Sequence, residues 1–230
     1  MVQIGISKWF SVQQLFQLYL VQWLRELSCG HFSYLLQFFQ EYFDYEKAPD
    51  VFKDSTPGHK HWAPALVYDL DQLILHTLKQ DRQVFRMLLT TREYFVYVNS
   101  HRDHGNPFVY NLPPDWKAVV NPVQFPKDQR MGVLTHPAWL IAHSSNFHTD
   151  PIKRGRWIRE KLLAGRVPDV PITVAAQVPE DPHKTFRERV ETVTQKAECL
   201  KCHQHMNPLG LPFEVFDDFG RYRLNEPLEY

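Results

Sequence analysis

The sequence predicts a mainly α-helical fold with long proline-containing loops. Apolar residues recur at helical spacing in several stretches, whereas the β-prone segments are short. The chain has 9 glycines and 17 prolines, and many of the prolines gather in residues 101–130 and 167–182. Because proline lacks a backbone donor and disfavours helix interiors, these two stretches are expected to be loops.

Several helices are expected before residue 100. Three stretches repeat apolar residues at helical spacing: residues 8–28, 31–43 and 63–79. Asp81 is expected to cap a further helix that runs through Leu89. Residues 94–98, YFVYV, favour an extended segment or a helix end.

The proline-rich loop around residue 110 is expected to separate two domains. The first, residues 1–110, is helical and its role is unknown; the second covers residues 111–230. In the second domain, residues 135–145 predict a short helix and residues 149–165 a longer one. Asp150 is the expected N-cap of the longer helix, Pro151 takes its first position and Gly165 ends it.

Composition excludes several classes of function. Lys plus Arg and Asp plus Glu number 26 each, so charge gives no reason to expect nucleic acid or an anionic membrane as a partner. No glycine-rich phosphate loop is present. Residues 1–27 are interrupted by Gln and Ser, and we expect neither a signal peptide nor a transmembrane segment there. The three cysteines do not form a disulfide scaffold, and Cys29 is expected to be a buried, inert thiol.

The segment ECLKCHQHMNPLG, residues 198–210, contains a Cys-x-x-Cys-His motif at the end of an expected continuous helix over residues 185–203. This spacing is typical of covalent c-type haem attachment. One helical turn separates Cys199 from Cys202, which suits two thioether bonds to the vinyl groups. The adjacent His203 would then be the proximal iron ligand.

Other interpretations of the motif remain open. A structural zinc site needs four ligands, and the nearby candidates are Cys199, Cys202, His203 and His205, with no second cysteine pair. A thioredoxin-type redox site calls for a βαβ context, which the surrounding pattern lacks. A free or disulfide-bonded cysteine pair in a loop is the remaining alternative.

The residues after the motif resemble a known family. Asn207, Pro208 and Gly210 are followed by a set of spaced residues: Phe213, Glu214, Phe216, Asp217, Gly220 and Arg223. Together with Cys-x-x-Cys-His, this pattern resembles planctomycete-type cytochrome-C-domain proteins. GVLTHPAWL and PIKRGRWIREKLLAG, upstream, resemble the same module, and residues 36–100 resemble the domain that usually precedes it. Asn207 stands where the family commonly has Asp, and Leu211-Pro212 shifts the Phe relative to the common pattern.

The resemblance implies a cytochrome-c-like module over residues 111–230 that holds haem c through Cys199, Cys202 and His203. It implies one-electron transfer, as the accessory of an exported oxidative system, with a redox partner protein or a linked oxidoreductase domain. We expect an electron-transfer protein rather than a self-contained enzyme, with no catalytic residues. Family members are exported, to the periplasm or beyond, and are usually far longer, so the chain is expected to be part of a longer protein. The alternative is a helical interaction module with a structural Cys/His zinc site.

The second axial ligand of the haem iron is left open. Met206 follows His203 by only three residues, so the chain cannot reach the opposite haem face. The remaining candidates lie upstream: Met131, His136 and His143, or the iron has no distal ligand.

The acidic residues of the signature are expected to be structural. Glu214, Asp217 and Asp218 lie among aromatic side chains. We expect this segment to pack onto the haem module, with Asp217 bound to backbone or to Arg221 or Arg223, rather than to form a catalytic carboxylate cluster.

Overall fold

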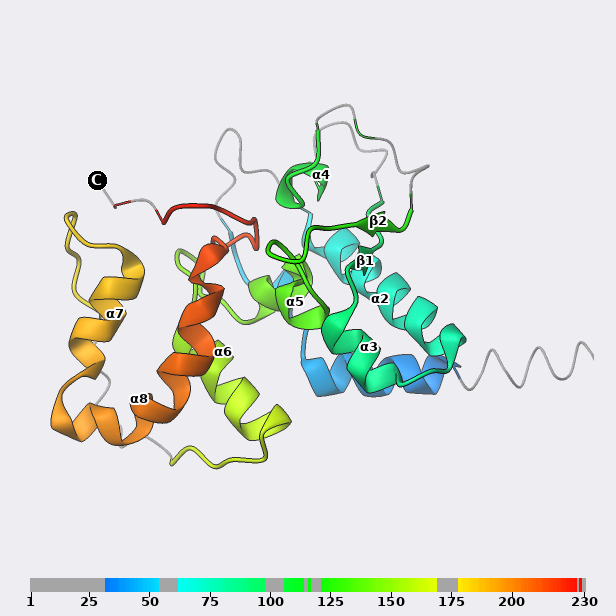
Figure 1. The fold of residues 1–230 in the computed structure, drawn as a ribbon. Coiled ribbons are helices and arrows are strands. Elements are labelled where there is room, and N and C mark those ends of the chain that lie inside the picture. Colours follow the sequence, from blue (N-terminus) through cyan, green and yellow to red (C-terminus); the bar gives the residue numbers. More distant parts are fainter. Residues whose placement is uncertain are drawn as a thin grey trace, which may run out of the picture.

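The computed structural model describes residues 32–53, 62–97, 106–113, 116, 121–168, 178–226 and 228. The fold is mainly α-helical, which confirms the predicted class (Figure 1). The expected helix over residues 8–28 and the expected buried thiol of Cys29 lie outside the described residues. None of the helices in the described ranges has the length and hydrophobicity that a membrane crossing requires.

The first part of the fold rests on helix α2 (Ala63–Gln80) and on a helix over residues 32–43. One face of α2 is fully buried at one-turn spacing, through Leu66, Leu70, Leu73 and Ile74. Burial of each such side chain contributes about 1.5–3 kcal/mol relative to exposure. A hydrogen bond from Gln40 Nε2 to Asp71 Oδ1, 3.1 Å, links the two helices. The 3₁₀ turn Ala48–Asp50 lies between them in the chain.

The expectation that Asp81 caps the next helix is wrong. Asp81 instead ends α2 in a left-handed conformation, with its backbone N–H bonded to the carbonyl oxygen of Leu78. Helix α3 (Val84–Thr90) begins after Gln83, which is also left-handed, and no side chain caps it. Two left-handed residues separated only by Arg82 reverse the chain sharply, so Asp81 belongs to the helix before the turn.

The β-prone segment forms only a short ribbon. Strand β1 (Glu93–Tyr94) pairs antiparallel with β2 (Val123–Gln124), with Tyr94 opposite Val123. The short helix α4 (Asn106–Val109) lies between them in the chain. This ribbon sits at one edge of a helical molecule (Figure 1).

The middle of the chain follows the sequence prediction closely. A 3₁₀ turn (Val133–Thr135) leads into helix α5 (Pro137–Ala142). Helix α6 (Pro151–Trp157) begins as expected, because the Asp150 side chain accepts a hydrogen bond from Lys153 N, 2.9 Å, and Pro151 takes the first position. A π-helical segment, Ile158–Leu162, continues α6 and ends before Gly165.

The expected continuous helix over residues 185–203 is two helices. Helix α7 (Phe186–Thr194) starts with a capping box between Thr185 and Glu188. Lys196 is extended, with ψ 142°, and interrupts the helical hydrogen bonding before α8 (Ala197–Gly210). The chain therefore turns, and α8 packs beside α7 instead of extending it (Figure 1). The 3₁₀ segment Leu211–Val215 follows.

Helix α8 lies between α7 and α6 (Figure 1). Its crossing with α6 is long and close. Two glycines allow this approach. A Cβ on Gly155 would lie 2.2 Å from the carbonyl oxygen of Met206, and one on Gly210 would clash with the carbonyl oxygen of Pro151. The side chain of Met206 is buried in the same crossing.

The hydrophobic core is continuous across the expected domain boundary. One cluster of buried residues includes Leu70 and Tyr94 from the first part and Trp139, Trp157 and Phe216 from the second. The packing of the described residues thus continues on both sides of residue 110. The division into two domains there stays a prediction.

Candidate functional site

The Cys-x-x-Cys-His motif lies in the first two turns of α8. Cys199 and Cys202 are half-buried free thiols at positions i and i+3, so both emerge from neighbouring parts of one helix surface. His203 is also half-buried and follows directly. The two thiols and the imidazole are thus presented together by one regular helix.

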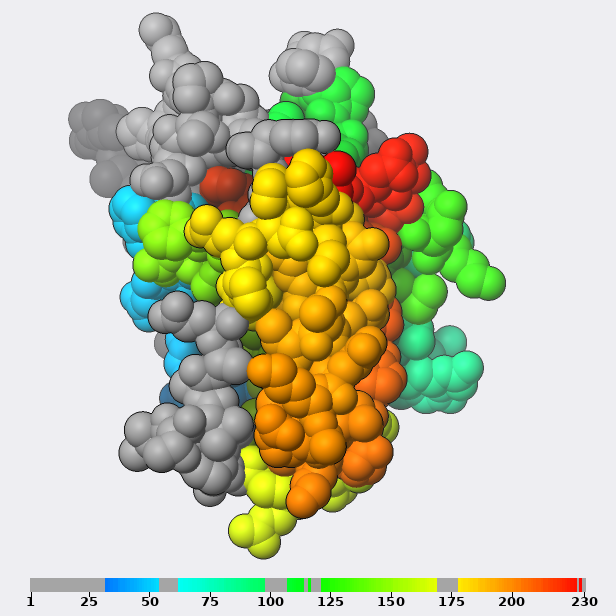
Figure 2. Space-filling model, turned by 90° about the vertical axis from the view of Figure 1, so that its left-hand side faces the viewer, coloured from blue at the N-terminus to red at the C-terminus, as the bar shows by residue number. Residues whose placement is uncertain are grey.

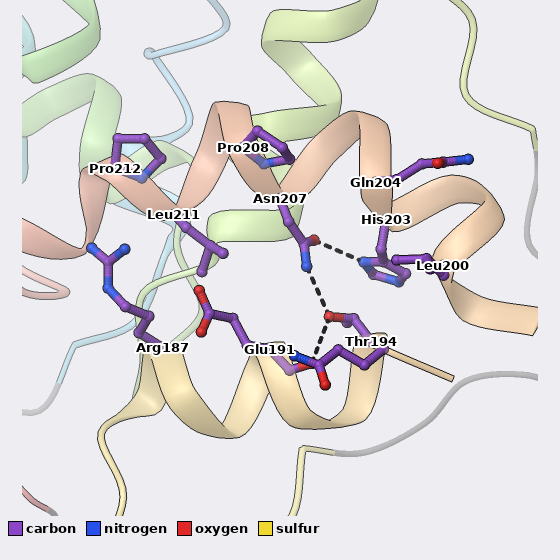
Figure 3. A pocket seen from close by; sticks show the side chains of 11 residues that line it. Arg187, Glu191, Thr194, Leu200, His203, Gln204, Asn207, Pro208, Leu211 and Pro212 are labelled. Carbon is purple, nitrogen blue, oxygen red and sulfur yellow. Dashed lines mark hydrogen bonds between the residues drawn. The ribbon is translucent and has the colours of Figure 1, made fainter. Parts of the chain in front are cut away.

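A pocket of about 420 Å³ opens between α7 and α8, beside His203 (Figure 3). This volume falls in the range of small-molecule sites, about 300–1,000 Å³. Its lining is mostly apolar on the α8 side, where Leu200, Pro208 and Leu211 contribute. Arg187 and Glu191 of α7 supply charged groups on the other wall.

The imidazole of His203 is held by a chain of hydrogen bonds between the two helices (Figure 3). His203 Nδ1 lies 3.1 Å from Asn207 Oδ1, and Asn207 Nδ2 donates to Thr194 Oγ1 at 2.8 Å. Thr194 Oγ1 in turn donates to the backbone oxygen of Val190 at 2.8 Å. Within the described residues, no hydrogen bond engages His203 Nε2.

These residues fit a covalently attached haem. Two thiols lie one helical turn apart beside an imidazole whose Nε2 is unengaged among the described residues, which is the donor set that the group needs. His203 also lines the adjacent pocket, whereas neither cysteine does. Among the described residues, no three or more His, Cys, Asp and Glu side chains are grouped so as to hold a metal ion.

The structure places the three distal-ligand candidates away from the His203 pocket, since none of them lines it. His136 is fully buried, and both of its ring nitrogens are engaged. Nε2 lies 3.0 Å from the hydroxyl of Tyr110, and Nδ1 accepts from Ala138 N at 3.2 Å. Met131 adjoins the turn at Thr135, where its backbone N–H bonds the threonine hydroxyl at 2.6 Å.

His143 has a free nitrogen but lies on the other side of α6. Its Nδ1 is 3.0 Å from the carbonyl oxygen of Trp139, and its buried Nε2 has no partner among the residues that the structure describes. The ring stacks on Trp139, with centroids 4.4 Å apart, and contacts Trp157 of α6. Residues 155 and 157 project from nearly opposite faces of a helix, and Gly155 is the residue that faces α8. Helix α6 therefore separates His143 from His203.

The environment of His143 keeps its imidazole neutral. Burial lowers its pKa to about 4, and the positive charges of Lys153 and Arg154 act in the same direction. Its hydrogen bond to the Trp139 carbonyl opposes the shift but does not outweigh burial. His143 is thus a core residue between aromatic rings.

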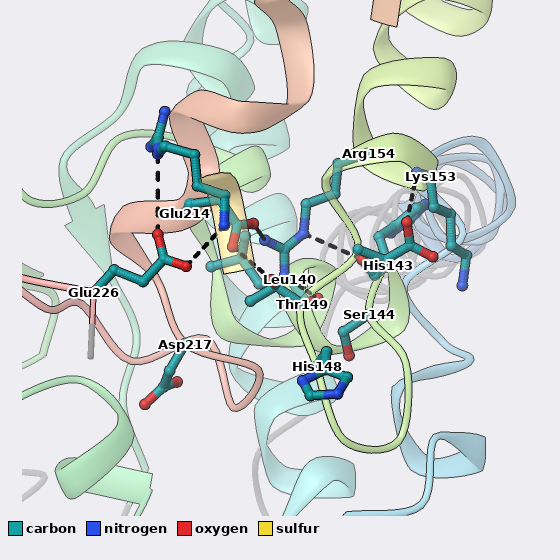
Figure 4. A network of polar contacts seen from close by, with 12 residues as sticks. Leu140, His143, Ser144, His148, Thr149, Lys153, Arg154, Glu214, Asp217 and Glu226 are labelled. Carbon is teal, nitrogen blue, oxygen red and sulfur yellow. Dashed lines mark hydrogen bonds and ion pairs between the residues drawn. The ribbon is translucent and has the colours of Figure 1, made fainter. Parts of the chain in front are cut away.

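The signature acid Glu214 is part of a buried ionic network (Figure 4). Its Oε2 accepts from Thr149 Oγ1 at 2.6 Å, and its Oε1 lies 3.7 Å from Arg154 Nη1. Arg154 also donates to the carbonyl oxygens of His143 and Leu140. Burial raises the pKa of Glu214, while Arg154 and Thr149 oppose the rise.

Asp217 binds backbone, as expected from the sequence. Its Oδ1 accepts from the N–H groups of Phe219 and Arg221, at 3.0 and 2.8 Å. Asp218 pairs instead with the buried Lys53, 3.1 Å away. These contacts hold the acidic segment to its own backbone and to Lys53.

Sequence reasoning missed the buried cations that anchor this segment. The sequence pattern does not single out Arg154, which lies between Lys153 and Gly155. Arg130 is also fully buried; it donates to the carbonyl oxygens of Val109 and Gly220 and lies 5.1 Å from the ring centre of Phe216. Nothing in the local pattern marks Arg130, because all of these partners are distant in sequence.

Comparison with known proteins supports part of the resemblance. No curated protein and no solved structure matches the chain. The resemblance over residues 36–100 stays a prediction. Residues 130–226 match the family described as PSCyt3, protein of unknown function (DUF1588). The matched residues include the Cys-x-x-Cys-His motif and the signature after it.

Proposed function

We propose that the chain carries one covalent haem c on α8 and transfers single electrons. Cys199 and Cys202 form the thioether bonds, and His203 Nε2 is the proximal ligand of the iron. The haem supplies a one-electron iron couple when it is bound. The chain's own residues attach it, orient the imidazole and shield one side from water.

The observation that supports this proposal is the joint placement of the motif and the pocket. The two thiols and His203 emerge from adjacent turns of α8, and His203 opens onto the apolar wall made by Leu200, Pro208 and Leu211. A ligand histidine usually has its second ring nitrogen bound to a neighbouring group, as Nδ1 is here.

The position of α8 suits exchange of electrons with another protein. Helix α7 and the first part of α8 occupy the centre of the face drawn in Figure 2. Cys199 and Cys202 are only half-buried, so a haem attached to them lies near that surface. We propose a redox partner protein or a linked oxidoreductase domain as the exchange partner, in an exported, periplasmic setting as in the family that the sequence resembles.

The test is covalent haem attachment. The protein is expressed with an export signal and a c-type maturation system, then stained for haem peroxidase activity on a denaturing gel. The parent and Cys29→Ala are expected to stain, and Cys199→Ala/Cys202→Ala is not. Absence of stain in all three, with about one zinc bound per chain, would contradict the proposal and favour a structural metal site.

A further inference from the structure

We infer that Thr194 and Asn207 are positioning residues that fix His203 in the tautomer with the proton on Nδ1, and so aim the Nε2 lone pair at a metal. This inference rests on the proposed haem site. It assigns a role to a residue of α7, outside the Cys-x-x-Cys-His motif, and to Asn207 at a position where the resembled family commonly has Asp.

The direction of the hydrogen-bond chain follows from its fixed end. The carbonyl oxygen of Val190 only accepts hydrogen bonds, so Thr194 spends its single hydroxyl proton there, 2.8 Å away. The second carbonyl within reach, that of Glu191 at 3.2 Å, also only accepts. Thr194 Oγ1 therefore has only lone pairs left for Asn207.

The amide of Asn207 is oriented by that lone pair. Its Nδ2 donates to Thr194 Oγ1 at 2.8 Å, which turns Oδ1 toward His203. Because Oδ1 has no proton, the 3.1 Å contact to His203 requires a proton on Nδ1. A neutral imidazole protonated on Nδ1 carries its lone pair on Nε2, the nitrogen that the described residues leave unengaged.

The chain is well placed to enforce this choice. Thr194 is buried, at 6% exposure, so water competes poorly for its hydroxyl. Asn207 follows His203 by one helical turn, on the same face of α8. Helix α7 thus supplies the fixed acceptor and α8 supplies the ligand, and the break at Lys196 is what brings the two together (Figure 3).

The inference also predicts how Asn207 tunes a bound iron. A carboxylate at this position would draw the Nδ1 proton more strongly, make the imidazole more basic and favour the ferric state. Asn207→Asp is therefore expected to lower the midpoint reduction potential of the loaded protein. Thr194→Val removes the group that orients the Asn207 amide and so weakens the hydrogen bond from His203 Nδ1 to Asn207 Oδ1. This variant is expected to raise the midpoint reduction potential.

The first test uses the protein without haem. Nitrogen-15 NMR of the histidine rings reports which nitrogen is protonated, and His203→Gln identifies the His203 signals. The parent and Thr194→Ser are expected to show the Nδ1–H tautomer. Thr194→Val is expected to lose it in favour of Nε2–H. Thr192→Val is the matched control, because Thr192 makes the same kind of bond to its own helix, to Glu188 O at 2.7 Å, but lies outside the pocket.

The second test uses the haem-loaded protein and separates this inference from the proposed function. If the parent takes up no haem, the proposed function fails, while the tautomer result still decides the role of Thr194. If the parent is loaded but Thr194→Val and Asn207→Asp leave the potential at the parent value, or if His203 is the Nε2–H tautomer in the parent, the positioning role is overturned.

Discussion

Arg154 joins three partners in the buried ionic network. Its guanidinium is fully buried, donates to two backbone carbonyls and faces Glu214 at 3.7 Å. A buried charge of this kind is tolerated only because its partners are fixed in place. Arg154 joins α5, α6 and the segment after α8 at one point.

Replacing Arg154 with Met is expected to destabilise the fold by about 3–5 kcal/mol. The buried Glu214 carboxylate loses its buried cation and keeps the Thr149 hydroxyl and Arg223, whose Nη2 lies 3.9 Å away. Urea unfolding followed by tryptophan fluorescence measures the change. Arg156→Met is the matched control on the same helix. Arg156 pairs with Glu160 at a partly exposed site, and its loss is expected to change stability by less than about 1 kcal/mol. Equal losses in the two variants would contradict the role assigned to Arg154.

His143 makes stability depend on pH. Its pKa is lowered to about 4 in the folded state, so the unfolded chain binds more protons between that value and about 6.5. The contribution is complete above pH 6.5 and is lost as pH falls toward 4. The full difference is roughly 3 kcal/mol. His143→Asn keeps a donor for the Trp139 carbonyl but does not titrate, and is expected to show a shallower acid loss in urea unfolding. A parallel pH dependence in both proteins would be inconsistent with this assignment.

At this scale the sequence identifies the residues of the motif but not their surroundings. Cys199, Cys202 and His203 are recognised from spacing alone, and Asp217 binds backbone as expected. The burial of Arg154 was not predictable, because whether an arginine is buried depends on a distant carboxylate, Glu214. The link between Thr194 and His203 was missed because it depends on how α7 packs beside α8.

The crossing of α6 and α8 is the element-level feature that positions the motif. Gly155→Ala is expected to destabilise the protein by about 1–3 kcal/mol or more, because the new Cβ would meet α8 backbone that no rotamer change relieves. The melting temperature measures the effect. Gly165→Ala is the control, since its Cβ would meet only the flexible side chain of Arg159. Equal melting temperatures for the two variants would rule out a tight α6–α8 crossing.

Helix starts with strong capping signals are predicted well, and helix breaks without glycine or proline are not. Asp150 and Pro151 mark the start of α6 in the sequence and in the structure. The break between α7 and α8 falls in Thr-Gln-Lys, which carries no punctuating residue. That break is stabilised by packing, since it allows Met206 to be buried against α6. Local propensity does not contain this information.

At the scale of the molecule, one cluster of buried side chains among the described residues spans both predicted domains. Asp69 of α2 accepts from the Tyr110 hydroxyl at 3.1 Å, and Tyr110 contacts His136 of the second part. A boundary near residue 110 follows from proline content, which reports on loops. Whether a loop separates two cores depends on the packing on either side of it, and sequence pattern does not show that packing.

The central claim is that α8 carries a covalent haem. Mass spectrometry of the denatured protein, after export with a c-type maturation system, tests it most directly. The account predicts a mass increase of one haem that survives denaturation, maps to the peptide containing Cys199 and Cys202, and is absent from Cys199→Ala/Cys202→Ala. The mass of the bare polypeptide, obtained while a control cytochrome c matures normally in the same cells, would contradict it.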